Sequence, residues 1–160
     1  MAVTMAEITK LRHLTSAGLM DCKKALNETN GDIEAAVEIL RKKGQAIAAK
    51  REDRQASEGC VLAANEGNFA AVVALKCETD FVAKNAGFVD LTMQILAAAM
   101  ANKPKSLDEL KAIVLNGQTI AELVTEESGK TGEKMELGAY EWVEAPSTTS
   151  YNHLGNKLAT

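Results

Sequence analysis

Apolar residues recur every three or four positions in three short stretches at the start of the chain. The three sets are Met5, Ile8, Leu11 and Leu14, then Leu19, Cys22, Ala25 and Leu26, then Ile33, Ala36, Val37 and Leu40. This spacing places each set on one face of a helix. Ser16 and Asp32 are suited to cap the second and third helices. Arg41-Lys42-Lys43 followed by Gly44 is typical of a helix C-terminus. We predict three short helices in a compact bundle over residues 1–44.

Residues 45–58 depart from this pattern, because they are strongly charged and have few apolar side chains. We interpret the segment as a linker with a helical first half and place a domain boundary there. The remaining residues, 59–160, then form a second domain.

Two apolar runs open this second domain. They cover residues 60–64 and 69–77, and Asn65-Glu66-Gly67-Asn68 separates them. A four-residue loop with glycine between two β-rich runs predicts a hairpin. The second run is apolar on both faces, so we expect a central strand that is covered on both sides. A third strand is expected over residues 135–143.

Helical patterns fill the interval between these strands. A first helix is expected to end before Pro104, with an apolar stripe made of Phe88, Leu91, Ile95 and Ala99. Ser106 with Glu109 and Thr119 with Glu122 have the spacing of capping boxes. The helices that they open carry Leu107, Leu110, Ile113 and Val114, and Ile120, Leu123 and Val124, respectively. The predicted fold class is therefore α+β, with an antiparallel sheet packed with helices after the three-helix module.

Composition and charge narrow the classes of partner. The formal net charge of −4 provides no overall attraction to nucleic acid or to an anionic membrane. No apolar run reaches the roughly 20 residues of a membrane span, and no secretory signal is recognisable. Cys22, Cys60 and Cys77 are odd in number and widely spaced, which indicates a reduced, cytoplasmic protein with small buried thiols.

Patterns typical of an active site are missing from the sequence. His13 and His153 lie far apart, and His13 belongs to the polar face of the first helix. No Gly-rich phosphate loop, H-E-x-x-H or G-x-S-x-G motif occurs. Carboxylates are scattered over helix starts and the linker. We therefore expect no enzyme activity, no metal site and no cofactor.

One stretch suited to binding another protein lies on the second helix. Met20 and Lys23 occupy the face opposite the apolar stripe, together with Lys24 and Asn27. An exposed thioether beside cations can pack on an apolar and acidic surface of a partner. The alternative is an ordinary surface with one stray methionine.

A second stretch, Thr79-Asp80-Phe81-Val82-Ala83-Lys84, directly follows the predicted central strand. Thr79 can cap a helix there, and Asp80 and Phe81 could then project together from the corner between strand and helix. Phe81 is one of only six aromatic residues, so its placement is informative. In the alternative interpretation Phe81 folds back into the core and Asp80 only caps a helix.

Both stretches resemble the bacterial translation elongation factor Ts family. The matching segments are Thr15 to Leu26, Asn30-Gly31-Asp32, Cys77 with Glu78-Thr79-Asp80-Phe81-Val82-Ala83-Lys84, and Tyr151-Asn152-His153-Leu154-Gly155-Asn156-Lys157. They occur in the order of the family, and the resemblance spans essentially the whole chain. Members usually continue well past the position of Thr160, so the chain resembles the front half, as a truncated form or a fragment. Self-association and full partner affinity are therefore in doubt.

The resemblance implies a module like ubiquitin-associated domains, a linker and an α+β core. It also implies the function, which is guanine-nucleotide exchange on the GTPase elongation factor Tu, GDP-bound or nucleotide-free, during translation elongation in the cytoplasm. Met20 and Lys23 match the patch that docks on the nucleotide-binding domain of the GTPase. The stretch associated with dislodging Mg²⁺ is matched by Thr79, Asp80, Phe81 and Val82, and Phe81 resembles the ring that wedges into the partner.

A second class of function stays open. A helical adaptor would bind a ubiquitin-like or nascent-chain partner through residues 1–44, without exchange activity, and would use the α+β domain as a scaffold. The corner at Asp80 and Phe81 discriminates between the two, because an adaptor does not need it.

Overall fold

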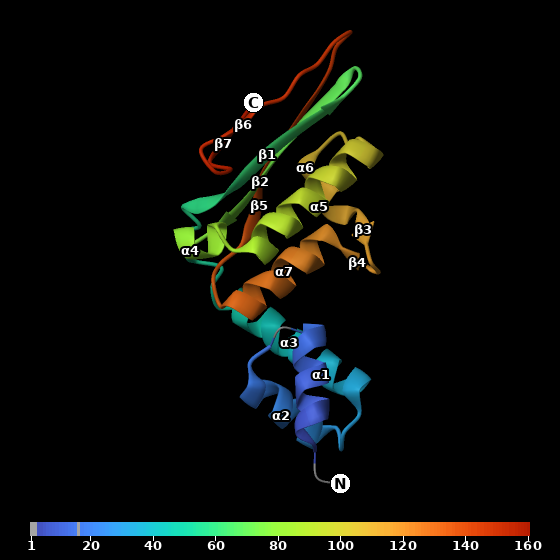
Figure 1. Cartoon of the computed structure of the whole chain (residues 1–160), viewed down its shortest axis with the longest axis vertical. Coiled ribbons are helices and arrows are strands. Elements are labelled where there is room, and N and C mark those ends of the chain that lie inside the picture. Colours follow the sequence, from blue (N-terminus) through green and yellow to red (C-terminus); the bar gives the residue numbers. More distant parts are fainter. Residues whose placement is uncertain (1–2, 16) are drawn as a thin grey trace.

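Three helices at the N-terminus form the lower part of the molecule in Figure 1. The structure is a computed structural model that describes residues 3–15 and 17–160. The helices are α1 (Met5–Thr15), α2 (Leu19–Glu28) and α3 (Ile33–Ala49). Their inner faces form one apolar cluster, made of Ile8, Leu11, Cys22, Ala25, Leu26, Ala36 and Leu40. The three predicted helices are confirmed, although Met5 and Leu14 of the first predicted stripe and Leu19 of the second are exposed.

The helix caps of this part agree in part with the sequence. Asp32 caps α3 as predicted, because its carboxylate accepts a hydrogen bond from the backbone N–H of Ala35 at 3.0 Å. Ser16, the predicted cap of α2, lies outside the described residues, and the N-cap position of α2 is occupied by Gly18. Helix α1 ends at Thr15 and α2 begins at Leu19, so the two helices are separated where the sequence predicts.

The predicted end of the third helix at Gly44 is wrong. Helix α3 continues to Ala49, so Gly44 lies inside it. At this point α3 crosses α7 (Ile120–Thr131), and Gly44 faces Gly129 across the crossing. Tertiary packing of this kind overrides the weak helix propensity of glycine. Helix α3 thus takes in residues 45–49 of the predicted linker. The linker and the domain boundary there stay predictions.

A three-stranded antiparallel sheet forms the upper part of the molecule, in the order β1–β2–β5. The strands are β1 (Glu58–Glu66), β2 (Phe69–Cys77) and β5 (Glu136–Glu144), so the predicted hairpin and the central position of β2 are confirmed. The predicted four-residue loop is wrong, because Glu66 pairs with Phe69 and leaves only Gly67 and Asn68 in the turn. Gly67 has φ +58°, a left-handed conformation that glycine adopts readily.

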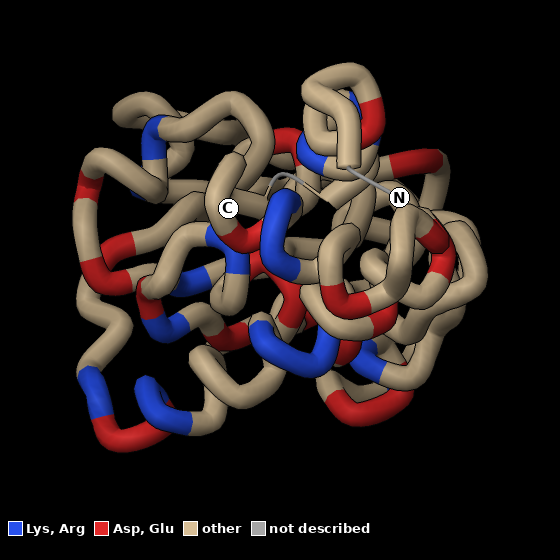
Figure 2. The backbone as a smooth tube through the Cα atoms, turned by 90° about the horizontal axis from the view of Figure 1, so that it is seen from below, with Lys and Arg blue, Asp and Glu red and all other residues tan. Residues whose placement is uncertain are grey.

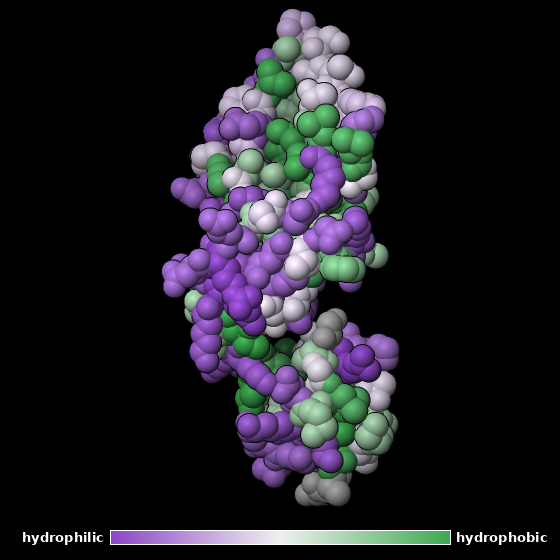
Figure 3. Space-filling model, turned by 90° about the vertical axis from the view of Figure 1, so that its left-hand side faces the viewer, coloured by the Kyte–Doolittle hydropathy of each residue, from purple (hydrophilic) through white to green (hydrophobic). Residues whose placement is uncertain are grey.

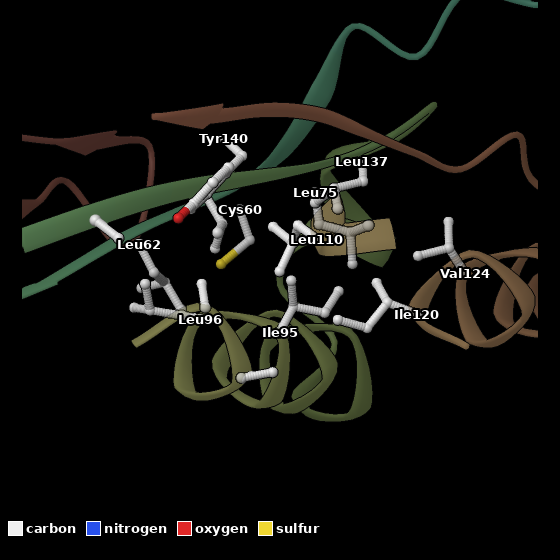
Figure 4. Close-up of a cluster of buried hydrophobic side chains, with 14 of the residues drawn as sticks. Cys60, Leu62, Leu75, Ile95, Leu96, Leu110, Ile120, Val124, Leu137 and Tyr140 are labelled. Atoms are coloured by element: carbon white, nitrogen blue, oxygen red, sulfur yellow. The ribbon is translucent and has the colours of Figure 1, made fainter. Parts of the chain in front are cut away.

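Helices cover one face of this sheet. They are α4 (Asp80–Ala83), α5 (Ala86–Asn102), α6 (Leu107–Ala112) and α7. Figure 4 shows side chains of the strands, such as Leu75 and Cys60, directed toward Ile95 of α5 and Ile120 of α7. On the opposite face of β2, Val72 and Ala74 are only half-buried. Strand β2 is therefore fully covered on one face, and the prediction that both faces are covered is only partly confirmed.

The two predicted capping boxes have different outcomes. Thr119 and Glu122 form a complete box at the start of α7. Ser106 Oγ accepts a hydrogen bond from the N–H of Glu109, but the Glu109 carboxylate accepts from Lys105 N at 2.7 Å instead of returning to Ser106. At the start of α6, the hydrogen bond from the Glu109 N–H to Ser106 is therefore present, and the return bond to the Ser106 N–H is missing.

Two small hairpins were not predicted. Helix α6 ends at Ala112, before the predicted Ile113 and Val114, because β3 (Val114–Leu115) pairs with β4 (Gln118–Thr119). Near the C-terminus, β6 (Asn152–His153) pairs with β7 (Leu158–Ala159). The Asn152 side chain fastens this second hairpin to β1, since it accepts from Ala63 N at 2.7 Å and donates to Ala63 O at 2.9 Å.

The surface carries interleaved charges of both signs, as the chain traced in Figure 2 shows. Within residues 3–15 and 17–160, no helix has both the length and the apolar character needed to cross a membrane. Cys22, Cys60 and Cys77 are free and buried, as predicted. Burial raises the pKa of the Cys60 thiol and, with the nearby Glu133 charge as a smaller cause, raises the pKa of Cys77 to about 11.

Candidate functional site

The corner between β2 and α4 carries an almost fully exposed phenyl ring. Thr79 has an extended backbone and caps α4, since its hydroxyl accepts a hydrogen bond from Val82 N at 3.4 Å. Ala83 is buried and Val82 is partly buried against the core. Phe81 is 84% exposed, more than any other large apolar residue among the described positions. The alternative in which Phe81 folds back into the core is therefore wrong.

Asp80 lies next to this ring and is paired within its own helix. Its carboxylate accepts a hydrogen bond from the Lys84 ammonium at 2.6 Å, and the Lys84 side chain is exposed while that of Asp80 is about half-exposed. The hydrogen bond and charge of Lys84 hold the pKa of Asp80 below its usual range. The corner thus presents an apolar ring beside an ionised carboxylate that a partner could recruit by competing with Lys84.

Glu133, which lies just before the neighbouring strand β5, accepts hydrogen bonds from the backbone of the corner. The sequence analysis did not identify this residue. One carboxylate oxygen accepts from the N–H groups of Glu78 and Thr79, both at 3.1 Å. The other oxygen accepts from the Thr79 hydroxyl at 2.6 Å. Glu133 therefore contacts the same threonine that caps α4.

Glu78 makes the return contact. Its carboxylate accepts from the N–H of Lys134 at 2.6 Å and from the Arg54 guanidinium at 3.0 Å. These two donors, the Lys134 N–H first, keep the pKa of Glu78 below its ordinary value. Lys134 also donates its ammonium to the carbonyl of Glu52 at 2.7 Å, so the charged segment after α3 is tied to the corner.

One signal in the sequence could have revealed this pairing. Glu78 directly follows the predicted central strand, and Glu133 stands shortly before the predicted strand over residues 135–143. The end of one antiparallel strand lies beside the start of its neighbour. If that pairing had been assumed, the two carboxylates would have been expected to lie close together.

Met20 and Lys23 form a separate surface on α2. Met20 is 72% exposed, and Lys23 and Lys24 are exposed beside it, while the opposite face is buried at Cys22 and Leu26. Within the part of the chain that the structure describes, Lys23 has no salt-bridge partner. The predicted exposure of Met20 is confirmed, and its role in docking stays a prediction.

The structure does not bring the two surfaces together. Helices α2 and α4 both lie toward the left of Figure 1, one in the lower part and one at the end of the sheet. Figure 3 shows the molecule from that side and reveals a hollow between the two parts. The hollow has a volume of about 390 Å³ and is lined by residues such as Leu14, Leu40 and Gly129. A partner that contacts both surfaces must therefore reach from the lower part of the molecule to the end of the sheet.

None of the described residues forms a group of three or more histidine, cysteine or acidic side chains arranged to hold a metal ion. The polar residues of the corner form hydrogen bonds within the chain, and the Phe81 ring is exposed. What the arrangement can do is present side chains to another macromolecule.

Comparison with known proteins places these residues in a family. A family model described as Elongation factor TS matches residues 78–160, which include the corner and Glu133. The chain is 66% identical over 161 residues to Elongation factor Ts of Parabacteroides distasonis, covering 100% of this chain and 49% of the relative. It is 62% identical over 161 residues to Elongation factor Ts of Porphyromonas gingivalis, covering 100% of this chain and 59% of the relative. The chain thus spans about half the length of the curated relatives it matches. Since the family match takes in more than half of the 160 residues, the chain belongs to the elongation factor Ts family.

Proposed function

We propose that this chain is a guanine-nucleotide exchange factor that promotes the release of GDP from elongation factor Tu during translation elongation in the cytoplasm. The observation that carries the proposal is the 84% exposure of Phe81 on a corner whose backbone is hydrogen-bonded to Glu133. Membership of the elongation factor Ts family supports a translational GTPase as the partner. In this role the chain breaks no covalent bond and uses no cofactor.

The mechanism depends on differential binding. A GTPase holds GDP through Mg²⁺ and through contacts to the phosphates, and an exchange factor binds best to the form in which these contacts are broken. Coupling between two ligands is reciprocal, so whatever the factor does to GDP affinity, GDP does to the affinity of the factor. The corner made of Thr79, Asp80, Phe81 and Val82 would enter near the Mg²⁺ and phosphate site and favour the broken form.

The magnitudes show how much Phe81 can contribute. A thousandfold faster release requires a barrier that is lower by about 4 kcal/mol. Burying an exposed phenyl ring in a partner contributes about 1.5–3 kcal/mol. Phe81 therefore supplies much of the effect, and the rest comes from other contacts.

Met20 and Lys23 provide docking in this proposal. The apolar thioether packs on the nucleotide-binding domain of the GTPase, and the Lys23 charge steers the encounter. Because α3 packs on α7, the docking surface and the corner belong to one connected body. Binding at one surface then raises the local concentration of the other near its own target.

The test is the release of a fluorescent GDP analogue from purified elongation factor Tu in stopped flow. Phe81→Ala is expected to keep its thermal midpoint and to slow the maximal release rate at least about tenfold. Met93→Ala is the matched control, because it removes a 56% exposed apolar side chain from α5. Equal rates for the wild type and Phe81→Ala would refute the wedge role. Capture of a ubiquitin-like protein in place of nucleotide-free elongation factor Tu would instead favour the adaptor.

A further inference from the structure

The pairing between β2 and β5 stops just before the corner. The last paired residues are Lys76 and Glu136, so the backbone beyond them lies outside the ladder. Two carboxylates bridge the strands at this point, Glu133 to the N–H groups of Glu78 and Thr79, and Glu78 to the N–H of Lys134. Charge-assisted hydrogen bonds of this kind are roughly twice as strong as neutral ones.

Glu133 is itself fixed by the end of α7. Helix α7 ends at Thr131, and its C-cap residue Gly132 has φ +72° and reverses the chain. The buried Ser128 hydroxyl donates to the Glu133 carbonyl at 2.5 Å, and the Glu133 N–H donates to the Thr131 hydroxyl at 3.3 Å. The backbone from which the carboxylate extends is therefore held in place before it reaches the corner.

Helix α4 needs an external anchor of this kind. It has four residues, and a single helical turn is unfavourable on its own because it fixes several dihedral angles for one hydrogen bond. Its N-cap is the Thr79 hydroxyl, and Glu133 Oε1 accepts the proton of that same hydroxyl. The hydroxyl can then offer its lone pair to the N–H of Val82. The direction of the next residue but one, Phe81, follows from this arrangement.

We propose that Glu133 is a positioning residue for nucleotide exchange, because its carboxylate holds Thr79 and thereby sets the direction in which Phe81 leaves the corner. The inference rests on the exchange function proposed above. Glu133 acts through Phe81 and need not touch the partner.

The test uses Glu133→Gln in the GDP-release assay with elongation factor Tu. A glutamine keeps the size of the side chain but has only one acceptor atom. With its oxygen on the N–H groups of Glu78 and Thr79, its amide nitrogen would face the Thr79 hydroxyl, which could no longer donate there. The maximal release rate is expected to fall about tenfold, as for the loss of one charged hydrogen bond, while the concentration for half-maximal release changes less than about twofold. Glu127→Gln is the control, because it removes the same charge from α7, where the carboxylate pairs only with Lys130 among the described residues.

A double variant shows whether Glu133 acts through the ring. When Phe81→Ala is already present, Glu133→Gln is expected to cause no further loss of rate, because there is no ring left to direct. Rates that multiply across the two substitutions would overturn the inference. An unchanged maximal rate for Glu133→Gln alone would do the same.

Thr79 supplies a second pair of variants in case Glu133→Gln fails to fold. Thr79→Val removes the hydroxyl at constant shape and is expected to slow release as Glu133→Gln does. Thr79→Ser keeps the hydroxyl and is expected to slow release clearly less than Thr79→Val does. Wild-type behaviour of Thr79→Val would count against the inference.

The two proposals fail in different ways. If Phe81→Ala leaves GDP release unchanged, the proposed exchange function of the corner fails, and the role of Glu133 fails with it. If Phe81→Ala slows release and neither Glu133→Gln nor Thr79→Val does so, only the positioning role is wrong.

Discussion

Gly129 of α7 packs directly on the backbone of Gly44 in α3. A Cβ atom on Gly129 would lie 2.7 Å from the carbonyl carbon and oxygen of Gly44, which is too close for any side chain. A Cβ atom on Gly44 would lie 3.5 Å from the Cα of Gly129, an ordinary van der Waals distance. The two glycines are therefore not equivalent, although they meet at one crossing.

Gly129→Ala is expected to destabilise the chain by about 1–3 kcal/mol, the usual result of overpacking. The clash involves backbone, which cannot move aside without shifting α3 or α7. In a thermal unfolding experiment the midpoint should fall. Small-angle scattering should show a change in the arrangement of the N-terminal helices relative to the sheet.

Gly44→Ala is the matched control and is expected to have the opposite sign. The position lies inside α3, where replacing glycine by alanine stabilises a helix by about 0.5–1 kcal/mol, and the new methyl group has room. An equal loss of stability in both variants would contradict the asymmetry of the contact.

These glycines also show where sequence analysis stops. Basic residues followed by Gly44 have the local chemistry of a helix end, and only the contact with the distant Gly129 explains why α3 continues. The corner at Phe81 could be predicted because the cap by Thr79 is local. The hydrogen bonds from the corner to the Glu133 carboxylate could not be predicted, because they depend on the pairing of β2 with β5, which are far apart in the sequence.

Lys23→Glu is expected to weaken docking on elongation factor Tu without lowering the maximal rate of GDP release. Reversing an exposed charge on α2 changes long-range attraction, so the half-maximal concentration should rise at low salt and the difference should shrink as salt screens it. Titrations at about 0.05 M and about 0.5 M salt measure this. Lys10→Glu, on the exposed face of α1, controls for net charge. A loss that is independent of ionic strength would show that the Lys23 charge is incidental.

The three thiols are expected to react slowly in the native protein. Cys22 is fully buried, and burial raises the pKa of Cys60 and, to about 11, that of Cys77. At pH 8 the thiolate fraction of Cys77 is then on the order of one thousandth. Titration with a thiol reagent should give no fast phase when native and three equivalents after unfolding. A fast native phase would show that one thiol reaches solvent.

The hydrogen bonds to Glu78 predict a specific dependence of stability on pH. The Lys134 N–H and then Arg54 lower the pKa of Glu78 in the folded chain below its ordinary value of 4.5. A carboxylate with a lowered pKa stabilises the fold above its ordinary pKa, and this contribution is lost as the pH falls through the lowered value. Glu78→Gln removes the charge and should lower the thermal midpoint at neutral pH. The difference from the wild type should shrink as the pH falls below 4.5.

The comparison isolates Glu78 because all other acidic groups are shared by the wild type and the variant. Glu66→Gln is the control, since it removes a carboxylate from the exposed end of β1 and is expected to shift the midpoint little at any pH. Thermal midpoints measured from about pH 7 to about pH 2.5 span the window in which Glu78 titrates. If the gap between wild type and Glu78→Gln stays constant over that range, Arg54 and the Lys134 N–H do not stabilise the ionised form of Glu78. The contact between Arg54, in the charged segment after α3, and Glu78 at the corner would then not stabilise the fold.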